Sequence, residues 1–216
     1  MKNKVSDFLL RLIFPERCIV CRRFIPKGYI CPQCEGEDTA VTVKLNISAG
    51  KESRLIKVFV PHRYEGNYRQ NIHRFKFDGN YHKGKAIARL IADRVPAEAF
   101  EGADYITYVP LGKETYRRRV YNQAEVIAKE LSKLTAIPTR DYITKIKQNK
   151  PQHSLSAKAR KKNVKGVFAL KEDIKGQKII LVDDIITTGE TMSECAKLLF
   201  KGGAEEVTCI CAASAN

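Results

Sequence analysis

The segment at residues 178–191 constrains the fold of this 216-residue chain most strongly. A continuous apolar run ends in Asp183 and Asp184, then passes through hydroxyl residues and Gly189 into a sequence with helical apolar spacing. This order predicts a buried strand, a tight turn and the start of a helix. In open parallel sheets, ligands bind beyond the carboxyl ends of the strands, where this turn would lie. The segment therefore predicts an α/β fold with a binding site at the turn.

The residues of the turn suit a phosphorylated sugar. Backbone amides at 188–191 and the neighbouring hydroxyls can donate to a phosphate, and the two acids can accept from vicinal ribose hydroxyls or hold a hydrated divalent ion. A structural alternative is open, because Thr187 and Glu190 have the spacing of a capping box and the acids could form a solvated edge. The candidate ligand-binding residues are Asp183, Asp184, Thr187, Thr188, Gly189, Glu190 and Thr191.

Residues 180–191 closely resemble the phosphoribosyl diphosphate (PRPP) loop of type I phosphoribosyltransferases. The shared pattern is four apolar residues, two acids, two apolar residues and then Thr-Thr-Gly-x-Thr. Glu190 departs from the commonest pattern, because it puts a negative charge where a small residue is frequent. The resemblance implies that this segment binds the ribose 5-phosphate of PRPP with Mg²⁺, and that Asp183 and Asp184 are the catalytic candidates.

The charge of the chain favours polyanionic partners. It carries 39 Lys and Arg against 24 Asp and Glu, a formal net charge of +15. Nucleic acid, diphosphates and an anionic membrane surface all fit this excess, although a solvated lysine-rich surface has the same composition. No apolar run reaches the 18 residues typical of a membrane span. One main domain in a cytoplasmic protein is expected.

A small module is predicted before the main domain. Residues 5–14 have the spacing of an amphipathic helix, which would pack on the protein or dock on a membrane as a peripheral contact. Two Cys-x-x-Cys pairs follow, nine residues apart, and indicate a structural Zn²⁺ site; two disulfides are the alternative, which a reducing cytosol disfavours. The predicted ligands are Cys18, Cys21, Cys31 and Cys34.

The remaining apolar patterns predict an antiparallel piece followed by a parallel core. Alternating apolar residues at 39–64 indicate a hairpin. Further elements are expected as a helix at 82–95, a strand at 105–110, a helix at 124–134 and strands at 142–147 and 206–214. We therefore divide the chain into residues 1–38, the helix and zinc module, and residues 39–216, with an antiparallel hood at 39–100 and a PRPP-binding core at 101–216.

Two basic segments are candidates for contacts with diphosphate or nucleic acid. A loop at 111–123 follows a strand end and carries three consecutive arginines, whose guanidinium groups bind phosphate oxygens in pairs. From residue 140 to residue 178 there are twelve Lys or Arg against three acids, as in a mobile lid or a nucleic-acid track. The candidates are Lys113, Arg117, Arg119, Asn122 and Gln123 in the first segment, Gln152, Lys158, Arg160, Lys161 and Lys162 in the second, and Lys76 elsewhere.

Along most of its length the chain resembles the ComF family, phosphoribosyltransferase-like proteins associated with DNA uptake in bacterial competence. The matching blocks are the four-cysteine N-terminus, Phe75-Lys76-Phe77-x-Gly79, Val109-Pro110-Leu111, Arg119-x-Tyr121-Asn122-Gln123, a patterned block at 152–168 and Lys201-Gly202-Gly203-Ala204. Val120 stands where a glycine is usual. The resemblance implies a mainly parallel twisted sheet flanked by helices with a small N-terminal zinc-binding module. It also implies a diphosphate loop at 113–119 and a flexible loop at 148–160.

By this resemblance the chain is a PRPP-binding protein that acts in DNA uptake and binds single-stranded DNA, with a DNA-translocating helicase as a candidate partner. Aromatic residues near basic ones could stack bases, although core packing is favoured for the phenylalanines. They are Tyr64, Tyr68, Phe75, Phe77 and Tyr81. The alternatives are an active phosphoribosyltransferase in nucleotide salvage or a related pathway, and a scaffold whose turn is only a helix cap.

Overall fold

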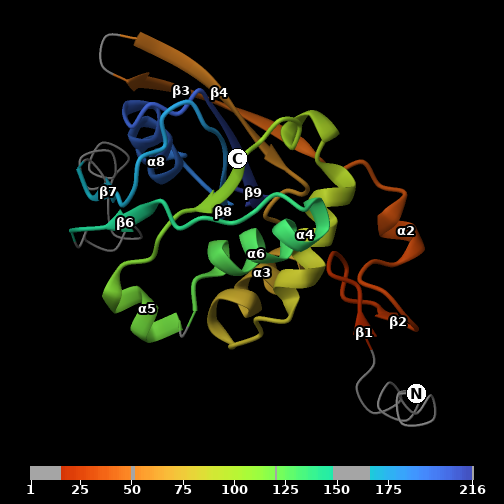
Figure 1. Cartoon of the computed structure of the whole chain (residues 1–216). Helices are drawn as coiled ribbons and strands as arrows, with labels where there is room; N and C mark the ends of the chain where they lie inside the picture. The colour runs from red at the N-terminus through yellow and green to blue at the C-terminus, as the bar shows by residue number, and fades with distance from the viewer. Residues whose placement is uncertain (1–15, 50–51, 120, 148–165, 216) are drawn as a thin grey trace, which may run out of the picture.

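A computed structural model describes residues 16–49, 52–119, 121–147 and 166–215 (Figure 1). The predicted helix at 5–14 and the basic stretch at 148–165 lie outside the described residues. Within the described residues, no helix is both long and apolar enough to cross a membrane.

A five-stranded mixed sheet forms the centre of the molecule. Its order is β3-β4-β9-β8-β5. The strands are β3 (Val41–Ala49), β4 (Glu52–Val60), β5 (Tyr105–Tyr108), β8 (Lys178–Ile186) and β9 (Glu206–Ser214). The β3–β4 pair is antiparallel, and the three other pairs are parallel. The predicted hairpin and the predicted mainly parallel sheet are therefore confirmed.

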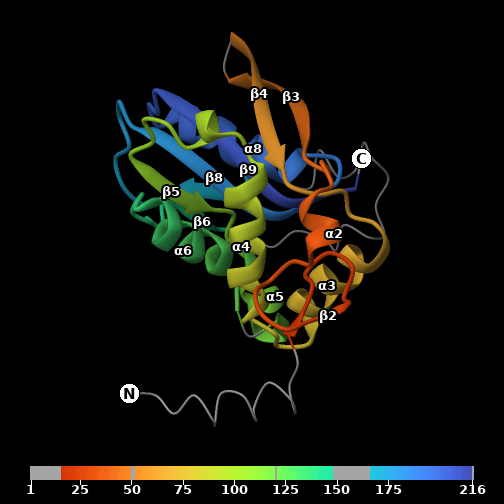
Figure 2. The same cartoon turned by 90° about the vertical axis from the view of Figure 1, so that its right-hand side faces the viewer.

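Helices cover both faces of this sheet (Figure 2). They are α3 (Gly66–Phe77), α4 (Lys83–Arg94), α6 (Gln123–Thr135) and α8 (Glu190–Lys201). Because side chains of a strand alternate between faces, β8 contributes to two cores. Ile180 and Val182 pack with α3, α4 and α6, whereas Ile179 and Leu181 pack with α8. This alternation explains why residues 179–182 of β8, an interior strand of the sheet, are apolar without a break.

Shorter elements complete the described chain. They are β1 (Glu16–Arg17), β2 (Phe24–Ile25), α2 (Pro32–Glu35), the 3₁₀ helix Ala97–Ala99, α5 (Lys113–Arg119), β6 (Ile143–Lys145) and β7 (Phe168–Leu170). The antiparallel β6–β7 pair stands apart from the main sheet.

One expectation about the backbone is wrong. Residues 113–119 form helix α5 instead of the predicted loop. The seven residues include no glycine or proline, and Lys, Glu and Arg have high helix propensity, so the segment becomes helical directly after Gly112. Consecutive residues of a helix are about 100° apart around its axis, so Arg117 and Arg119 leave α5 in different directions.

The four-cysteine segment packs against the main domain. Ile19, Val20 and Ile25 are buried in the same cluster as residues of α3 and α4. The Asn71 side chain on α3 donates a hydrogen bond to the Ile19 carbonyl at 2.5 Å, and Arg94 on α4 donates to the Cys34 carbonyl. In both contacts a side chain of the main domain binds a backbone carbonyl of the cysteine segment. The segment can make these contacts only when its own backbone is folded, because the fold sets where the carbonyls point.

Candidate functional site

The two acids at the end of β8 face opposite sides of the sheet. Asp184 continues the parity of Val182, which points toward α3, α4 and α6, and Asp183 continues that of Leu181, which points toward α8. The adjacent carboxyl groups therefore have different surroundings, although the sequence presents them as a pair.

Asp184 is held between two cations. The Lys76 ammonium, at the end of α3, lies 2.9 Å from one carboxylate oxygen, and an Arg119 nitrogen, at the end of α5, lies 3.7 Å from the other. Asp184 is 8% exposed, so these pairs are only weakly screened by water. The three residues lie more than 40 positions apart in sequence and converge because α3 and α5 meet the carboxyl end of β8.

Gln123 positions both cations. Its side-chain amide nitrogen donates to the Lys76 carbonyl at 3.3 Å, while its oxygen accepts from Arg119 at 3.2 Å. Asn122 is equally structural: it caps α6 by accepting from the Ala124 amide at 3.0 Å and donates to the Val109 carbonyl at 3.0 Å. Both amides are buried and satisfied by the protein. Their sequence block thus shapes the site around Arg119.

Asp183 lies in much less polar surroundings. Burial and the neighbouring Asp184 charge raise its pKa to about 7. The thiols of Cys195, Cys209 and Cys211, which are buried on the same side, have raised pKa values through burial and, next, the Asp183 charge. These cysteines are core residues. The oxygen of Asp183 accepts the Asp184 backbone amide at 2.8 Å. The site therefore combines one paired carboxylate with one whose ionisation is disfavoured.

The turn after β8 supplies a helix N-terminus beside these acids. Helix α8 begins at Glu190, with Gly189 as its N-cap in the left-handed conformation (φ 75°). The capping-box alternative needs Thr187 at the N-cap, whereas Gly189 occupies that position. Thr187 and Thr188 are exposed, and Thr191 is partly so. The first amides of α8 point out of the helix toward this turn, where an anion is favoured.

Gly189 is required for two reasons. A left-handed backbone costs a residue with a Cβ about 1–2 kcal/mol. A Cβ at this position would also stand 2.5 Å from a methyl carbon of Leu45, on β3 of the hairpin. The hairpin therefore packs directly over the turn.

We expect Gly189→Ala to lower the free energy of unfolding by about 1–3 kcal/mol, because the backbone and steric costs add. Chemical denaturation measures this. The double variant Leu45→Ala, Gly189→Ala should show a favourable coupling energy, since shortening Leu45 removes the clash but leaves the backbone cost. Additive effects of the two changes would contradict the contact.

The basic candidates separate into different environments. Arg119 reaches Asp184, whereas Arg117 is exposed on α5. Nothing is described of the Lys113 side chain. Gln152, Lys158, Arg160, Lys161 and Lys162 lie outside the described residues.

Lys145 is a basic residue near the site that the sequence did not single out. Its side chain, at the end of β6, packs against Gly112, where an added Cβ would lie 3.3 Å from it. Burial lowers the pKa of this ammonium. One sequence signal could have identified Lys145 as a candidate: it stands at the end of a predicted strand, directly before the basic stretch.

A groove of about 640 Å³ lies elsewhere, at the amino end of β9. Arg54, Lys57, Glu98 and Phe200 are among its lining residues. In a parallel pair of strands this end is opposite to Asp183 and Asp184. The groove therefore does not belong to the acid pair.

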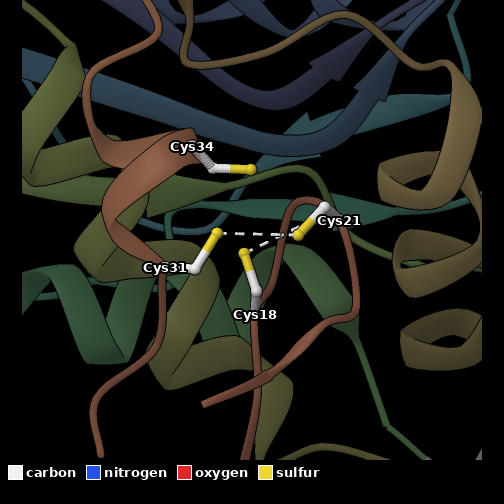
Figure 3. A group of neighbouring side chains, drawn as sticks. All are labelled: Cys18, Cys21, Cys31 and Cys34. Atoms are coloured by element: carbon white, nitrogen blue, oxygen red, sulfur yellow. Dashed lines mark hydrogen bonds between the residues drawn. The ribbon is translucent and has the colours of Figure 1, made fainter.

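The four N-terminal cysteines converge in space (Figure 3). Cys18 and Cys21 come from the turn between β1 and β2, whereas Cys31 and Cys34 come from the start of α2 and the helix itself. All four sulfur atoms lie within 4.8 Å of one another. The Cys21 and Cys31 sulfurs are 3.6 Å apart, and none of the seven cysteines forms a disulfide.

This geometry fits a tetrahedral metal. A zinc ion at about 2.3 Å from each thiolate separates the sulfurs by about 3.8 Å. The Cys21 amide also points at the Cys18 sulfur at 3.5 Å, which stabilises a thiolate. A backbone hydrogen bond from Cys34 lowers the pKa of Cys31 to about 7. The cluster could therefore bind a metal such as zinc, and four sulfur ligands leave no coordination position for a substrate.

Comparison with known proteins agrees with this architecture. The Phosphoribosyl transferase domain family matches residues 120–216. DNA utilization protein YhgH of Escherichia coli (strain K12) is 30% identical over 202 residues, which cover 90% of this chain and 89% of that protein. Competence protein F of Haemophilus influenzae is 32% identical over 198 residues, covering 88% and 86% respectively. Competence protein ComFC of Bacillus subtilis is 27% identical over 210 residues, covering 92% and 85%.

These alignments cover most of this chain and most of each relative. The predicted type I phosphoribosyltransferase fold with its N-terminal cysteine cluster is thus confirmed. The chain belongs to the ComF family, which includes Competence protein F and DNA utilization protein YhgH.

Proposed function

We propose that this chain is a PRPP-binding protein that acts in DNA uptake or utilisation and binds single-stranded DNA. The observation that carries the PRPP part is the end of β8 and the turn that follows: the strand carries two acids near its carboxyl end, and helix α8 begins at Glu190, directly after the turn. Relatives named for competence and DNA utilisation support the DNA part.

The proposed ligand matches the site group by group. The amides and hydroxyls at 187–191 would hold the 5-phosphate, Asp183 and Asp184 the ribose hydroxyls, and Mg²⁺ the diphosphate oxygens. Lys76 and Arg119 already lie at the acid pair, and with Lys145 they are the cations best placed for the diphosphate. The flexible-loop residues, Gln152 to Lys162, stay candidates for closing over the ligand.

A bound ligand can replace the two ion pairs that Asp184 forms with Lys76 and Arg119. In the free protein the carboxylate satisfies Lys76 and Arg119. A ligand with ribose hydroxyls and a diphosphate offers the carboxylate donors and the cations acceptors. Asp184, Lys76 and Arg119 therefore have polar partners both in the free protein and in the complex. These partners offset the desolvation cost of burying the three charged side chains.

We expect calorimetry to detect PRPP binding that requires Mg²⁺. PRPP at 100 times its dissociation constant should stabilise the fold by about 2.7 kcal/mol, which thermal unfolding can measure as a rise of about 5–10 °C in Tm. Ribose 5-phosphate should bind more weakly because it lacks the diphosphate. If PRPP and Mg²⁺ leave both heat and Tm unchanged, the PRPP part of the proposal is wrong.

The DNA part is tested separately. Affinity for a single-stranded oligonucleotide should fall as salt rises, with a slope of about −0.7 for each phosphate contact. An affinity that salt does not alter, or the absence of binding, would reject this part without affecting the PRPP result.

An active phosphoribosyltransferase is the second candidate, favoured by the domain match at 120–216. In that reaction an acceptor displaces diphosphate from the ribose carbon, and the protein stabilises charge through positioned donors. Diphosphate release with a nucleobase or amine would support it. Inertness toward a broad acceptor panel, with PRPP binding intact, would reject turnover.

A further inference from the structure

Three large aromatic side chains stand out on the surface next to the cysteine segment and the α3–α4 turn. Phe24 on β2 is 55% exposed, Phe77 at the end of α3 is 52% exposed, and Tyr81 is 53% exposed. Of the five aromatic residues suggested by sequence, Tyr68 and Phe75 are instead buried in the core. Phe77 and Tyr81 therefore have their ring surfaces available to a partner.

Each exposed ring already stacks with a flat polar group. The Arg17 guanidinium carbon lies 3.8 Å from the centre of the Phe24 ring, and that of Arg119 lies 5.2 Å from the Phe77 ring. The imidazole of His82 is 4.0 Å from the Tyr81 ring centre. These are the partners that also stack on nucleobases, so a base could extend each stack.

Unpaired positive charge accompanies the rings. Lys83, at the start of α4, lies near Arg17, Arg22 and Arg74, and these cations lower its pKa further after burial has done so. Asp78 is the nearby acid and acts in the opposite direction. Among the residues that the structure describes, no ion pair engages any of the four cations. Asp78 is therefore near these cations without forming a salt bridge with any of them among the described residues.

The rings and cations follow one another across the molecule. Helix α3 lies between the β1–β2 segment and α5 (Figure 1). Arg17, which stacks on Phe24, lies near Lys83 at the start of α4. Tyr81 stands two residues before Lys83, and Phe77, at the end of α3, stacks with Arg119. These six residues are named the aromatic–cationic track. Its far end is next to the acid pair, because Arg119 also contacts Asp184.

We propose that the aromatic–cationic track is the surface on which the single-stranded DNA lies, with bases stacked on Phe24, Tyr81 and Phe77. This assignment rests on the proposed DNA role and adds where the strand binds. Flat rings with cations beside them match a strand whose bases can stack and whose phosphates carry the negative charge. A membrane would instead favour clustered apolar side chains, and here each ring is stacked with an arginine or a histidine.

The test compares aromatic variants by fluorescence anisotropy with an oligodeoxythymidine of about 20 nucleotides. Phe77→Ala and Tyr81→Ala should each weaken binding about 5- to 100-fold, and Phe77→Trp should restore most of the loss, because stacking needs a ring. Arg17→Gln should lower the salt slope by about 0.7. Leu55→Ala is the matched control, since Leu55 is an apolar residue 62% exposed on β4, outside the track.

The possible results distinguish failure of the proposed DNA-binding surface from failure of the proposed DNA role. If the parent protein does not bind the oligonucleotide, both are wrong. If it binds and the Phe77 and Tyr81 variants bind equally well, the DNA role stands and the track is wrong. An equal loss in Leu55→Ala would also overturn the track, because the effect would not be specific to it. Circular dichroism and thermal unfolding verify that each variant is folded.

Discussion

An Asp183→Asn variant is expected to lose PRPP binding and yet to unfold at a higher temperature than the parent protein at pH 8. The loss follows from removing a carboxylate that would accept ribose hydroxyls, which costs about 1.5–3 kcal/mol for each charged hydrogen bond. Two such bonds give at least about a 100-fold fall in affinity. Calorimetry with PRPP and Mg²⁺ measures it.

The gain in stability follows from the surroundings of Asp183. Its pKa is raised from 3.8 to about 7 by burial and by Asp184, so its ionised form destabilises the fold. Asparagine removes that charge and keeps an oxygen that can accept the Asp184 amide. The expected rise in Tm at pH 8 is about 3–8 °C, since 1 kcal/mol corresponds to roughly 2–4 °C at this chain length.

The pH dependence makes this expectation specific. The unfolded carboxyl group titrates near 3.8 and the folded one near 7, so the folded state binds more protons between these values. The contribution of Asp183 to stability is complete below pH 4 and is lost as pH rises through 7. The variant lacks this dependence. Its advantage in Tm should therefore be small at pH 5 and largest at pH 8; a constant difference would contradict the assignment.

Asp184→Asn is the matched control. It removes the charge of the neighbouring acid, but it should lower Tm, whereas Asp183→Asn should raise it. Lys76 and Arg119 would lose their carboxylate, and partly buried cations without a partner cost about 1–3 kcal/mol. This variant should also lose PRPP binding, but with a lower Tm. Two variants that share the binding defect and shift Tm in opposite directions cannot both be explained by misfolding.

The contrast between the two acids also defines what the sequence could predict. The apolar run before Asp183 was enough to identify a buried strand, and the strand period of two determines that adjacent acids face opposite sides. The sequence pattern does not predict which residues surround each of the two acids. Lys76 and Arg119 come from helices far away in the chain, and their approach depends on how α3, α5 and α6 pack on the sheet.

Backbone conformation explains where the structure differs from one alternative and one prediction of the sequence analysis. Thr187 is not the N-cap that the capping-box alternative requires, because Gly189 adopts a left-handed conformation and starts α8 two residues later than Thr187 would. The loop at 111–123 was predicted from its charge, whereas its backbone follows helix propensity at 113–119. In both cases the sequence shows the pattern of side chains. It does not show the backbone conformation, which decides where the helix forms.

Removing the metal from the four-cysteine cluster is expected to destabilise far more than the cysteine segment. We propose that the cluster holds one structural zinc ion per chain. Residues 16–36 have little secondary structure of their own, and their buried side chains share a core with α3 and α4. Chelation should lower Tm by about 10 °C or more, because zinc-binding energy in small sites is folding energy of about 10 kcal/mol or more.

The effect should also reach the acid pair. Asn71, which holds the Ile19 carbonyl, is on α3, and the same helix ends in Lys76 beside Asp184. Loss of the segment exposes one side of α3 and loosens the placement of Lys76. PRPP affinity should therefore fall after chelation by a smaller factor than in Asp183→Asn, and zinc should restore it.

A pair of variants at one ligand position distinguishes metal binding from packing. Cys21 is the most exposed of the four cysteines, so substitutions there disturb the core least. Cys21→His offers a nitrogen that zinc accepts, whereas Cys21→Ser offers a poor ligand. Metal analysis should find one zinc per chain in the parent and the histidine variant, and a clear loss with a lower Tm in the serine variant. Equal metal content and equal Tm in both variants would mean that the convergence of the sulfurs is only packing, because a coordinating position must discriminate between imidazole and hydroxyl.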